Sequence, residues 1–258
     1  MDKIRVGTSG YSFQDWKGPF YPPGLSDGEM LPFYARHFSC VEINSTYYRI
    51  PHFRVFEHLV KKTPDDFEFM VKVHAQVTHA RKDPHSSITA LVQAAEPLMD
   101  SGKFTGFLAQ FPYSFKNRAE SRKYLADVAE LAGQWPLYVE FRHKSWDTPP
   151  LYDFLKRQNV GYVNVDEPEL PNLLPRQCLA TTDVAYVRFH GRNRHTWWNG
   201  DRGERYDYHY SKPELEPWKR DIAGILDRVM KIYLFFNNCY HGQAAQNALE
   251  MKALLTGI

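Results

Sequence analysis

Pairs of polar side chains close most of the apolar segments in this 258-residue sequence. The two members of each pair are two residues apart, so in a strand they would point to the same face. Together they supply carboxylates, cations, imidazoles and amides, which could exchange protons and bind an anion. The pairs are Glu42 and Asn44, Lys72 and His74, Glu140 and Arg142, Asn164 and Asp166, and Arg188 and His190, with Gln110 and Asn237 as single members on two further segments.

His190 is the best candidate for a general acid/base, because an imidazole exchanges protons near neutral pH. Glu140 or Asp166 would orient its ring. Lys72 and Glu42 complete the predicted catalytic set, since ionisable groups gathered in one polar site often have shifted pKa values. As an alternative, the same charges could neutralise one another and only fill the interior of the fold.

The interleaved cations favour an anionic ligand over a metal ion. Arg142 and Arg188 could hold a phosphate or carboxylate through their planar guanidinium groups, with Lys72 as an adjacent point charge. The other predicted ligand contacts in this group are Asn44, His74, Gln110 and Asn237. The sequence has no HxH or HExxH pair, so we expect no metal cofactor. If a divalent metal were bound, the predicted ligands would be His74, Glu140, Asp166 and His190.

Two loops rich in aromatic residues would extend this site. Residues 10–24 contribute Trp16 as a predicted ligand contact, although their glycines lack nucleotide-binding spacing. Residues 191–210 alternate arginines with aromatic rings, and there Arg192 and Trp197 are predicted contacts. Such alternation suits a ligand with phosphates and flat rings, such as a nucleotide or a single nucleic-acid strand. Either loop could also be a packed cover that binds nothing.

Strand and helix patterns alternate along the chain. Segments rich in Val, Phe, Tyr and Ile predict strands at 4–9, 40–46, 67–73, 105–111, 137–142, 161–166, 185–191 and 231–237. Helices are predicted at about 29–38, 53–62, 86–100, 118–132, 149–158, 213–228 and 242–256. Ser211 and Glu214 match a capping box. This order predicts a single α/β domain over residues 1–258, a (β/α)8 TIM barrel. Three prolines make 167–184 an irregular crossover between strands six and seven.

The alternation within the strands predicts which side chains face the barrel interior. The opposite register would bury charged groups against the helices, which is costly. The polar residues would then meet at the C-terminal end of the barrel, where barrel enzymes bind their substrates. The predicted inward residues include Met70, Lys72, His74, Tyr138, Glu140, Arg142, Asn164, Asp166, Tyr186, Arg188 and His190. An open doubly wound sheet would not explain polar ends on nearly every strand.

The amino-acid composition limits the classes of protein to which this chain can belong. The hydrophobic fraction of 43% is enough for a large core, and a net charge of +2 neither requires nor excludes a nucleic-acid partner. Its three cysteines are isolated, which favours a reducing compartment over a disulfide framework. The start of the chain lacks the apolar core of a signal peptide, and no segment is apolar enough to span a bilayer. We therefore expect a soluble, cytoplasmic protein without membrane contact.

Seven segments resemble the YecE-like family, domain-of-unknown-function family 72. They are GTSGYSFQDWKGPFYP (7–22), VEINSTYYRIP (41–51), FMVKVHAQVTH (69–79), LAQFPYSF (108–115), VEFRHKSW (139–146), YVRFHGRN (186–193) and YLFFNNCYHGQAAQNA (233–248). The resemblance implies a TIM barrel and no known reaction. All the candidate residues on strands fall within these segments except Asn164 and Asp166.

The sequence leaves several functions open. The first hypothesis is an enzyme of the hydrolase or lyase type that acts on a small anionic, phosphate-bearing substrate. The alternative is a nucleic-acid-binding or endonuclease-like barrel, in which Arg192 and Arg194 would contact phosphates. A carbohydrate-acting enzyme using Glu42 and Glu140, or a binding protein without catalysis, is a further alternative.

Overall fold

Eight parallel strands form the centre of the structure, a computed structural model that describes residues 3–200 and 203–257. The strands are β1 Ile4–Thr8, β2 Cys40–Ile43, β3 Glu68–Lys72, β4 Phe104–Gln110, β5 Leu137–Glu140, β6 Val160–Asp166, β7 Val184–Phe189 and β8 Lys231–Phe236. Their order, β1-β8-β7-β6-β5-β4-β3-β2, brings β1 and β2 to the two sides of one seam. There Ser9 bridges to Glu42, and the Gly10 N–H donates to the Glu42 carbonyl at 2.8 Å. The predicted (β/α)8 barrel is confirmed.

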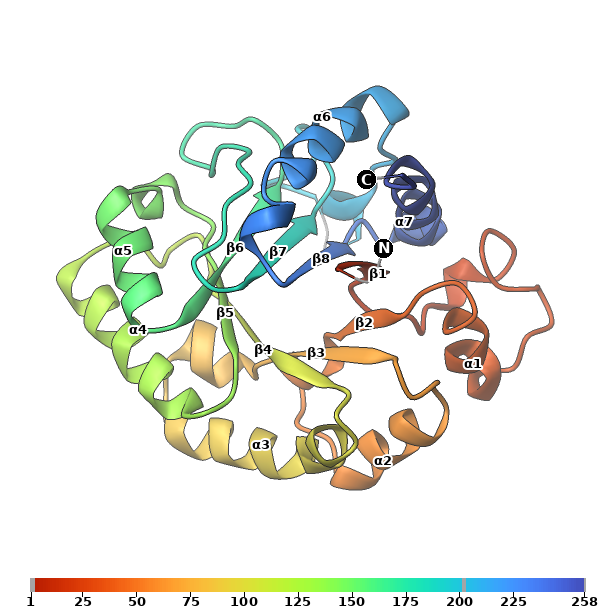
Figure 1. Cartoon of the computed structure of the whole chain (residues 1–258), viewed down its shortest axis with the longest axis horizontal. Helices are drawn as coiled ribbons and strands as arrows, with labels where there is room; N and C mark the ends of the chain where they lie inside the picture. Colours follow the sequence, from red (N-terminus) through yellow and green to blue (C-terminus); the bar gives the residue numbers. More distant parts are fainter. Residues whose placement is uncertain (1–2, 201–202, 258) are drawn as a thin grey trace.

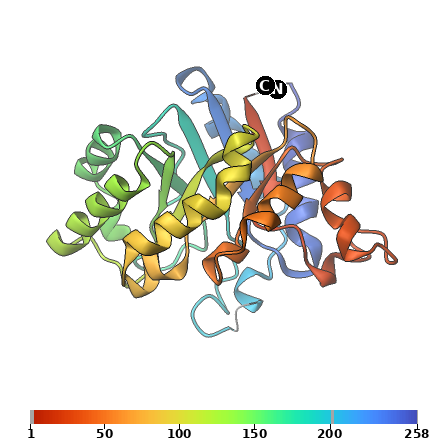
Figure 2. The same cartoon turned by 90° about the horizontal axis from the view of Figure 1, so that it is seen from below.

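Helices surround the strands on the outside (Figure 1). They are α1 Met30–Tyr34, α2 Phe53–Lys61, α3 Pro84–Asp100, α4 Ala119–Ala132, α5 Pro149–Arg157, α6 Lys212–Ala223 and α7 Gln243–Leu254. The predicted capping box of Ser211 and Glu214 starts α6. The start of β1 and the end of α7 lie together at one end of the barrel, and the loop after β7 projects from the opposite end (Figure 2). No helix among the described residues is long and apolar enough to cross a membrane.

An apolar layer fills the part of the barrel interior on the N-terminal side of the charged residues. Its members are Cys40, Met70, Leu108, Tyr138, Val163, Tyr186, Tyr233 and Phe235, with at least one from each strand except β1. Tyr138 fits because β6 has Gly161 beside it: a Cβ at that position would lie 2.3 Å from the tyrosine ring. The inward faces predicted for β3, β5 and β7 are confirmed by Met70, Tyr138 and Tyr186 in this layer.

The register predicted for β6 is wrong. Val163 faces the barrel interior, whereas Asn164 and Asp166 point outward. The irregular crossover 167–184, which is confirmed, has no helix and runs along the outside of this strand. Its backbone needs hydrogen-bond partners, and Asn164 supplies them by accepting from the Leu179 N–H at 3.0 Å and donating to the Leu179 carbonyl at 2.8 Å.

Candidate functional site

A cavity of about 720 Å³ opens at the C-terminal ends of the strands. This volume is typical of sites that bind small molecules. Of the residues predicted from the sequence, Asn44, Lys72, Gln110, Arg142, Arg188, Trp197 and Asn237 line it. Trp198, Arg205 and Tyr206 also line it and belong to the loop 191–210 that was predicted to extend the site, whereas the predictions missed Tyr47, His79 and Tyr113. The cavity therefore combines several cations with many aromatic rings.

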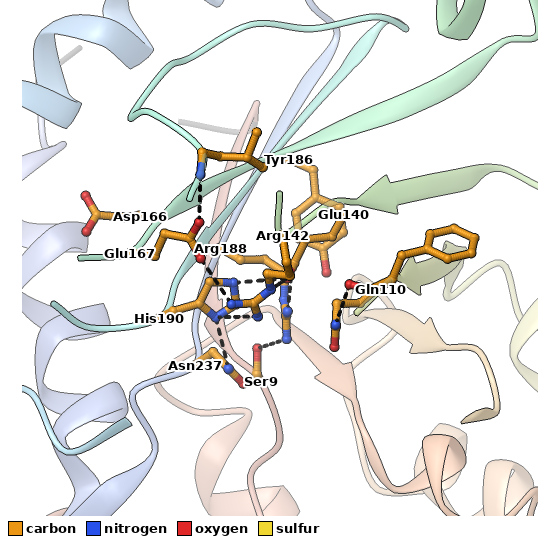
Figure 3. Close-up of polar contacts among 12 residues, drawn as sticks. Ser9, Gln110, Glu140, Arg142, Asp166, Glu167, Tyr186, Arg188, His190 and Asn237 are labelled. Carbon is orange, nitrogen blue, oxygen red and sulfur yellow. Dashed lines mark hydrogen bonds and ion pairs between the residues drawn. The ribbon is translucent and has the colours of Figure 1, made fainter. Parts of the chain in front are cut away.

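A buried ion-pair network forms the floor beneath this cavity (Figure 3). Arg188, from β7, extends across the barrel to Glu42 of β2, with Nε–Oε2 and Nη2–Oε1 distances of 2.8 and 2.6 Å. Its Nη1 donates to Glu140 Oε2 at 2.6 Å. Both carboxylates are fully buried, and removal of a cationic partner from a buried ion pair is strongly destabilising.

Arg142 links the network to the cavity. Its Nε lies 2.6 Å from Glu140 Oε1, and its Nη1 lies 3.2 Å from Glu167 Oε2. On the cavity side its guanidinium lies 6.0 Å from the centre of the Trp197 ring. Burial alone would raise the pKa of Glu140, but the Arg142 and Arg188 guanidiniums outweigh it and hold that pKa well below its usual range.

His190 is buried beneath the cavity and does not line it. Burial and the neighbouring Arg142 lower its pKa to about 3, so the imidazole is neutral at physiological pH. Its Nε2 lies 3.2 Å from Glu140 Oε1, and its Nδ1 is 3.1 Å from Asn237 Nδ2. The Nδ1 contact fits a ring that accepts there from the Asn237 amide, whereas Nε2 and Glu140 Oε1 lie close together without hydrogen-bond geometry. His190 is therefore placed to position Arg142 and Glu140, whereas a direct proton transfer to a ligand would need contact with the cavity.

Lys72 lies at the end of β3 and lines the cavity. Its Nζ donates to Gln110 Oε1 at 3.0 Å and lies 4.7 Å from the centre of the Tyr47 ring. No carboxylate of the described chain forms an ion pair with it. Burial and the nearby Arg188 lower the pKa of Lys72 to about 7. A large fraction of this amine is consequently neutral at physiological pH.

His79 lines the cavity beside Lys72, and its ring lies 5.0 Å from the Tyr47 ring. It belongs to a π-helix, Gln76–Ala80, a rare form that often occurs at functional sites. Arg81 directly after it has a positive φ of 50°, which is unfavourable for a residue other than glycine. Burial and then Lys72 lower the pKa of His79 to about 4. Burial is the larger cause of the lowered pKa of both Lys72 and His79, and neighbouring cations add to it.

Glu167 is the acidic residue that the sequence interpretation missed. It is buried and contacts Arg142, while its Oε1 accepts from the Leu174 N–H at 3.1 Å. Burial raises the pKa of Glu167 to about 7, despite the opposing effect of Arg142. Alternation could have identified it, because Val163, Val165 and Glu167 form one face of β6 and its extension.

A protein-family comparison gives a match over residues 5–257, and the family is described as "Protein of unknown function DUF72". The chain belongs to the DUF72 family. The resemblance predicted from its sequence is thus confirmed. The UPF0759 protein YunF of Bacillus subtilis is 33% identical to this DUF72 protein, over 98% of this chain and 94% of YunF.

Crystal structures of two other DUF72 proteins share the fold. The one from Thermotoga maritima is 44% identical, with a TM-score of 0.92 over 98% of this chain and 99% of its own. The one from Enterococcus faecalis is 30% identical, with a TM-score of 0.87 over 98% of this chain and 95% of its own. Neither description names a reaction, so chemistry must be argued from the residues of the site.

Four predicted site residues of this DUF72 protein neither line the cavity nor belong to the ion-pair network on its floor. Trp16 is fully buried, and its Nε1 donates to the Cys239 carbonyl at 2.7 Å. His74 Nε2 lies 3.3 Å from the Tyr48 carbonyl. Asp166 and Arg192 lie outside the barrel and pair with each other, with an Nη2–Oδ2 distance of 2.6 Å. Figure 3 shows Asp166 directed away from the network on the cavity floor.

Asp166 is therefore in the helix layer, which corrects its predicted catalytic position. It accepts from Arg192, from the Tyr210 hydroxyl at 2.8 Å and from Trp218 Nε1 at 2.7 Å. We predict that Asp166→Asn lowers the free energy of unfolding by about 2 kcal/mol, because a buried, fully hydrogen-bonded acceptor is disturbed. Chemical denaturation measures the loss, and the exposed Asp127→Asn is the control, expected within about 0.5 kcal/mol of wild type. A loss no larger than that of the control would contradict this role.

The residues predicted for the alternative functions make contacts within this DUF72 protein. Glu42 and Glu140 both bind Arg188 beneath the cavity, so neither is placed to attack a sugar. Arg192 pairs with Asp166, and Arg194 donates to the Glu169 carbonyl at 2.8 Å, which commits both predicted phosphate contacts to the protein itself. Of the four suggested metal ligands, His190 and Glu140 are in contact, whereas Asp166 points away from them. Within the described residues no three His, Cys, Asp or Glu side chains form a metal site.

Proposed function

We propose that this protein is an enzyme of the lyase or hydrolase type that acts on a small anionic, phosphate-bearing substrate in the cavity at the C-terminal end of the barrel. The observation that carries the proposal is Lys72, an amine that lines the cavity and whose pKa is about 7. A group with this pKa can both accept and donate a proton at physiological pH, which is the requirement for a general acid/base. Its position at the end of a barrel strand is where catalytic residues occur in this fold.

The charge of the cavity supports an anionic substrate. Its lining includes Lys72, Arg142, Arg188 and Arg205, against a single acid, Asp15, among the described lining residues. Arg142 and Arg188 are already paired with the carboxylates of the floor. Arg205 differs: its guanidinium lies 5.5 Å from the Trp197 ring, and its buried Nε has no hydrogen-bond partner in the described structure. Arg205 is therefore the cation best able to take a phosphate or carboxylate.

The two functional groups reach the cavity from different parts of the barrel ring. Lys72 ends β3, whereas Arg205 follows β7, and these strands are separated by three others in either direction around the ring. A substrate held by its anionic group at Arg205 would extend across the mouth toward Lys72. The aromatic rings between them, including Tyr113 and Trp198, whose centres are 4.7 Å apart, could contact its apolar or flat part.

Phosphorus NMR tests the proposal. The protein would be incubated at pH 7 with sugar phosphates, nucleoside monophosphates and phosphorylated hydroxy acids. The phosphorus spectra would show both release of phosphate and rearrangement of the substrate. We expect at least one compound to be converted by the wild type, and Lys72→Met to slow that conversion by at least about 100-fold, as for loss of a general acid/base. Lys123→Met, at an exposed site on α4, should have no effect. The proposal fails if no compound is converted, or if Lys72→Met retains the wild-type rate.

A further inference from the structure

Lys72 has surroundings that suit covalent chemistry as well as proton transfer. Its Nζ faces the cavity with one neutral acceptor, Gln110 Oε1, and the face of the Tyr47 ring as its neighbours. The Gln110 amide is fixed in this orientation, because its Nε2 donates to the Phe111 carbonyl at 2.9 Å. An amine hydrogen-bonded in this way keeps its lone pair available whenever it is deprotonated.

A second, independent observation points to a ligand group beside this amine. Asn44 lines the cavity, and its Oδ1 is buried without a hydrogen-bond partner in the described structure. Ile43 pairs with Val71 in the register of β2 and β3, so Asn44 and Lys72 follow on neighbouring strands. A buried acceptor without a donor is costly. The carbonyl of Asn44 is thus placed to accept a hydrogen bond from a hydroxyl that forms next to the Lys72 amine.

We propose that Lys72 forms an imine with the carbonyl group of an anionic aldehyde or ketone substrate, with Asn44 accepting from the hydroxyl of the intermediate. This rests on the proposed function and narrows it to lyase chemistry. The neutral amine attacks the carbonyl carbon, and a proton moves from nitrogen to the carbonyl oxygen to give a carbinolamine. The remaining proton of the nitrogen is then transferred to that hydroxyl, which leaves as water while the C=N bond forms. The net change is amine plus carbonyl to imine plus water, without oxidation or reduction.

The consequence of the imine is activation of the neighbouring carbon. Once protonated, the C=N group withdraws electrons from the bond next to it, so that a C–H or C–C bond there can break. The cations around the cavity would hold the substrate's phosphate or carboxylate, and the aromatic rings would limit the access of water that reverses the imine. The chemical class of the substrate is therefore a small oxo compound that carries an anionic group.

Reductive trapping tests the imine without knowledge of the natural substrate. Glycolaldehyde phosphate would be added with sodium cyanoborohydride, and the modified lysines would be located by peptide mass spectrometry. At pH 7 we expect Lys72 to be labelled at least about 10-fold faster than the exposed Lys123, because far more of its amine is neutral. The rate at Lys72 should rise as pH passes through 7. Asn44→Ala should slow labelling at Lys72 and leave Lys123 unchanged.

Three outcomes separate the two proposals. Labelling of Lys72 no faster than of Lys123 overturns the imine, and the proposed function stands if phosphorus NMR still shows Lys72-dependent conversion. Equal labelling by glycolaldehyde phosphate and by unphosphorylated glycolaldehyde keeps the reactive amine but removes the anionic substrate. Faster labelling by the phosphorylated aldehyde, lost on Arg205→Ala, supports both.

Discussion

Glu140→Gln should lower the free energy of unfolding by about 3–5 kcal/mol, the largest loss expected from a single conservative substitution in this protein. The side chain keeps its shape but loses its charge, so Arg142 and Arg188 each lose a carboxylate contact of 2.6 Å. Arg188 is almost completely buried, and water cannot replace that contact. Urea unfolding, followed by both circular dichroism and tryptophan fluorescence, measures the loss where the two transitions coincide.

Two comparisons isolate the network as the cause. Glu130→Gln, on the exposed face of α4, makes the same chemical change and should cost less than about 0.5 kcal/mol. The double variant Glu140→Gln with Arg142→Met should lose less than the sum of its single variants, because it removes a charge and its partner together. Additive losses would contradict the ion-pair network.

The acid side of the stability profile should change as well. The pKa of Glu140 is held well below its usual range, so its contribution is complete above about pH 4.3, the unfolded value, and disappears as pH falls through the folded pKa. The wild type should therefore lose more stability than Glu140→Gln between pH 5 and the acid transition. Parallel profiles would show that Glu140 is not held charged by its partners.

Alternation in the sequence identified most of the floor of the cavity. On β3, β5 and β7 only one register keeps charged side chains away from the helices, so Lys72, Glu140 and Arg188 had to face inward. The same rule failed on β6, because the crossover 167–184 brings backbone polar groups to the outside of that strand. Polar side chains such as Asn164 are then favoured on the outside. The outward direction of Asp166 depends in addition on Trp218 and Tyr210, whose approach no local pattern predicts.

The roles within the floor could not be predicted from the sequence. Alternation places Glu42 and Arg188 on inward faces, but their direct contact depends on the reach of the arginine across the closed barrel. Burial and Arg188 together lower the pKa of Lys72. Burial and Arg142 lower the pKa of His190 and keep its ring neutral. Because of these effects, Lys72 is a better candidate for a general acid/base than His190, the residue that the sequence favoured. The sequence supplied the residue types, and their electrostatic environment came from strands distant along the chain.

The stability of the wild type should rise with pH from about 7 to 10.4, the interval between the folded pKa of Lys72 and the ordinary lysine pKa. Because that pKa is lowered, the unfolded chain binds more protons than the native state in this interval, and unfolding becomes less favourable as pH increases. Below pH 7 the native state must hold a charged amine in a half-buried site without a carboxylate partner. Lys72→Met removes this cost and should raise the free energy of unfolding at pH 6 by about 2–4 kcal/mol.

The difference between Lys72→Met and wild type should then shrink steadily as pH rises from 7 toward 10.4, because well above that pH the lysine is neutral in both states. Lys123→Met, which removes an exposed charge, should show no such trend. A constant difference across this range, or a wild type more stable than Lys72→Met at pH 6, would contradict a lowered pKa at Lys72. An amine retained at a cost to folding, in a cavity lined by cations, is expected where function selects the residue and stability opposes it. Greater stability together with lost conversion of phosphate compounds in the same variant would identify Lys72 as such a residue.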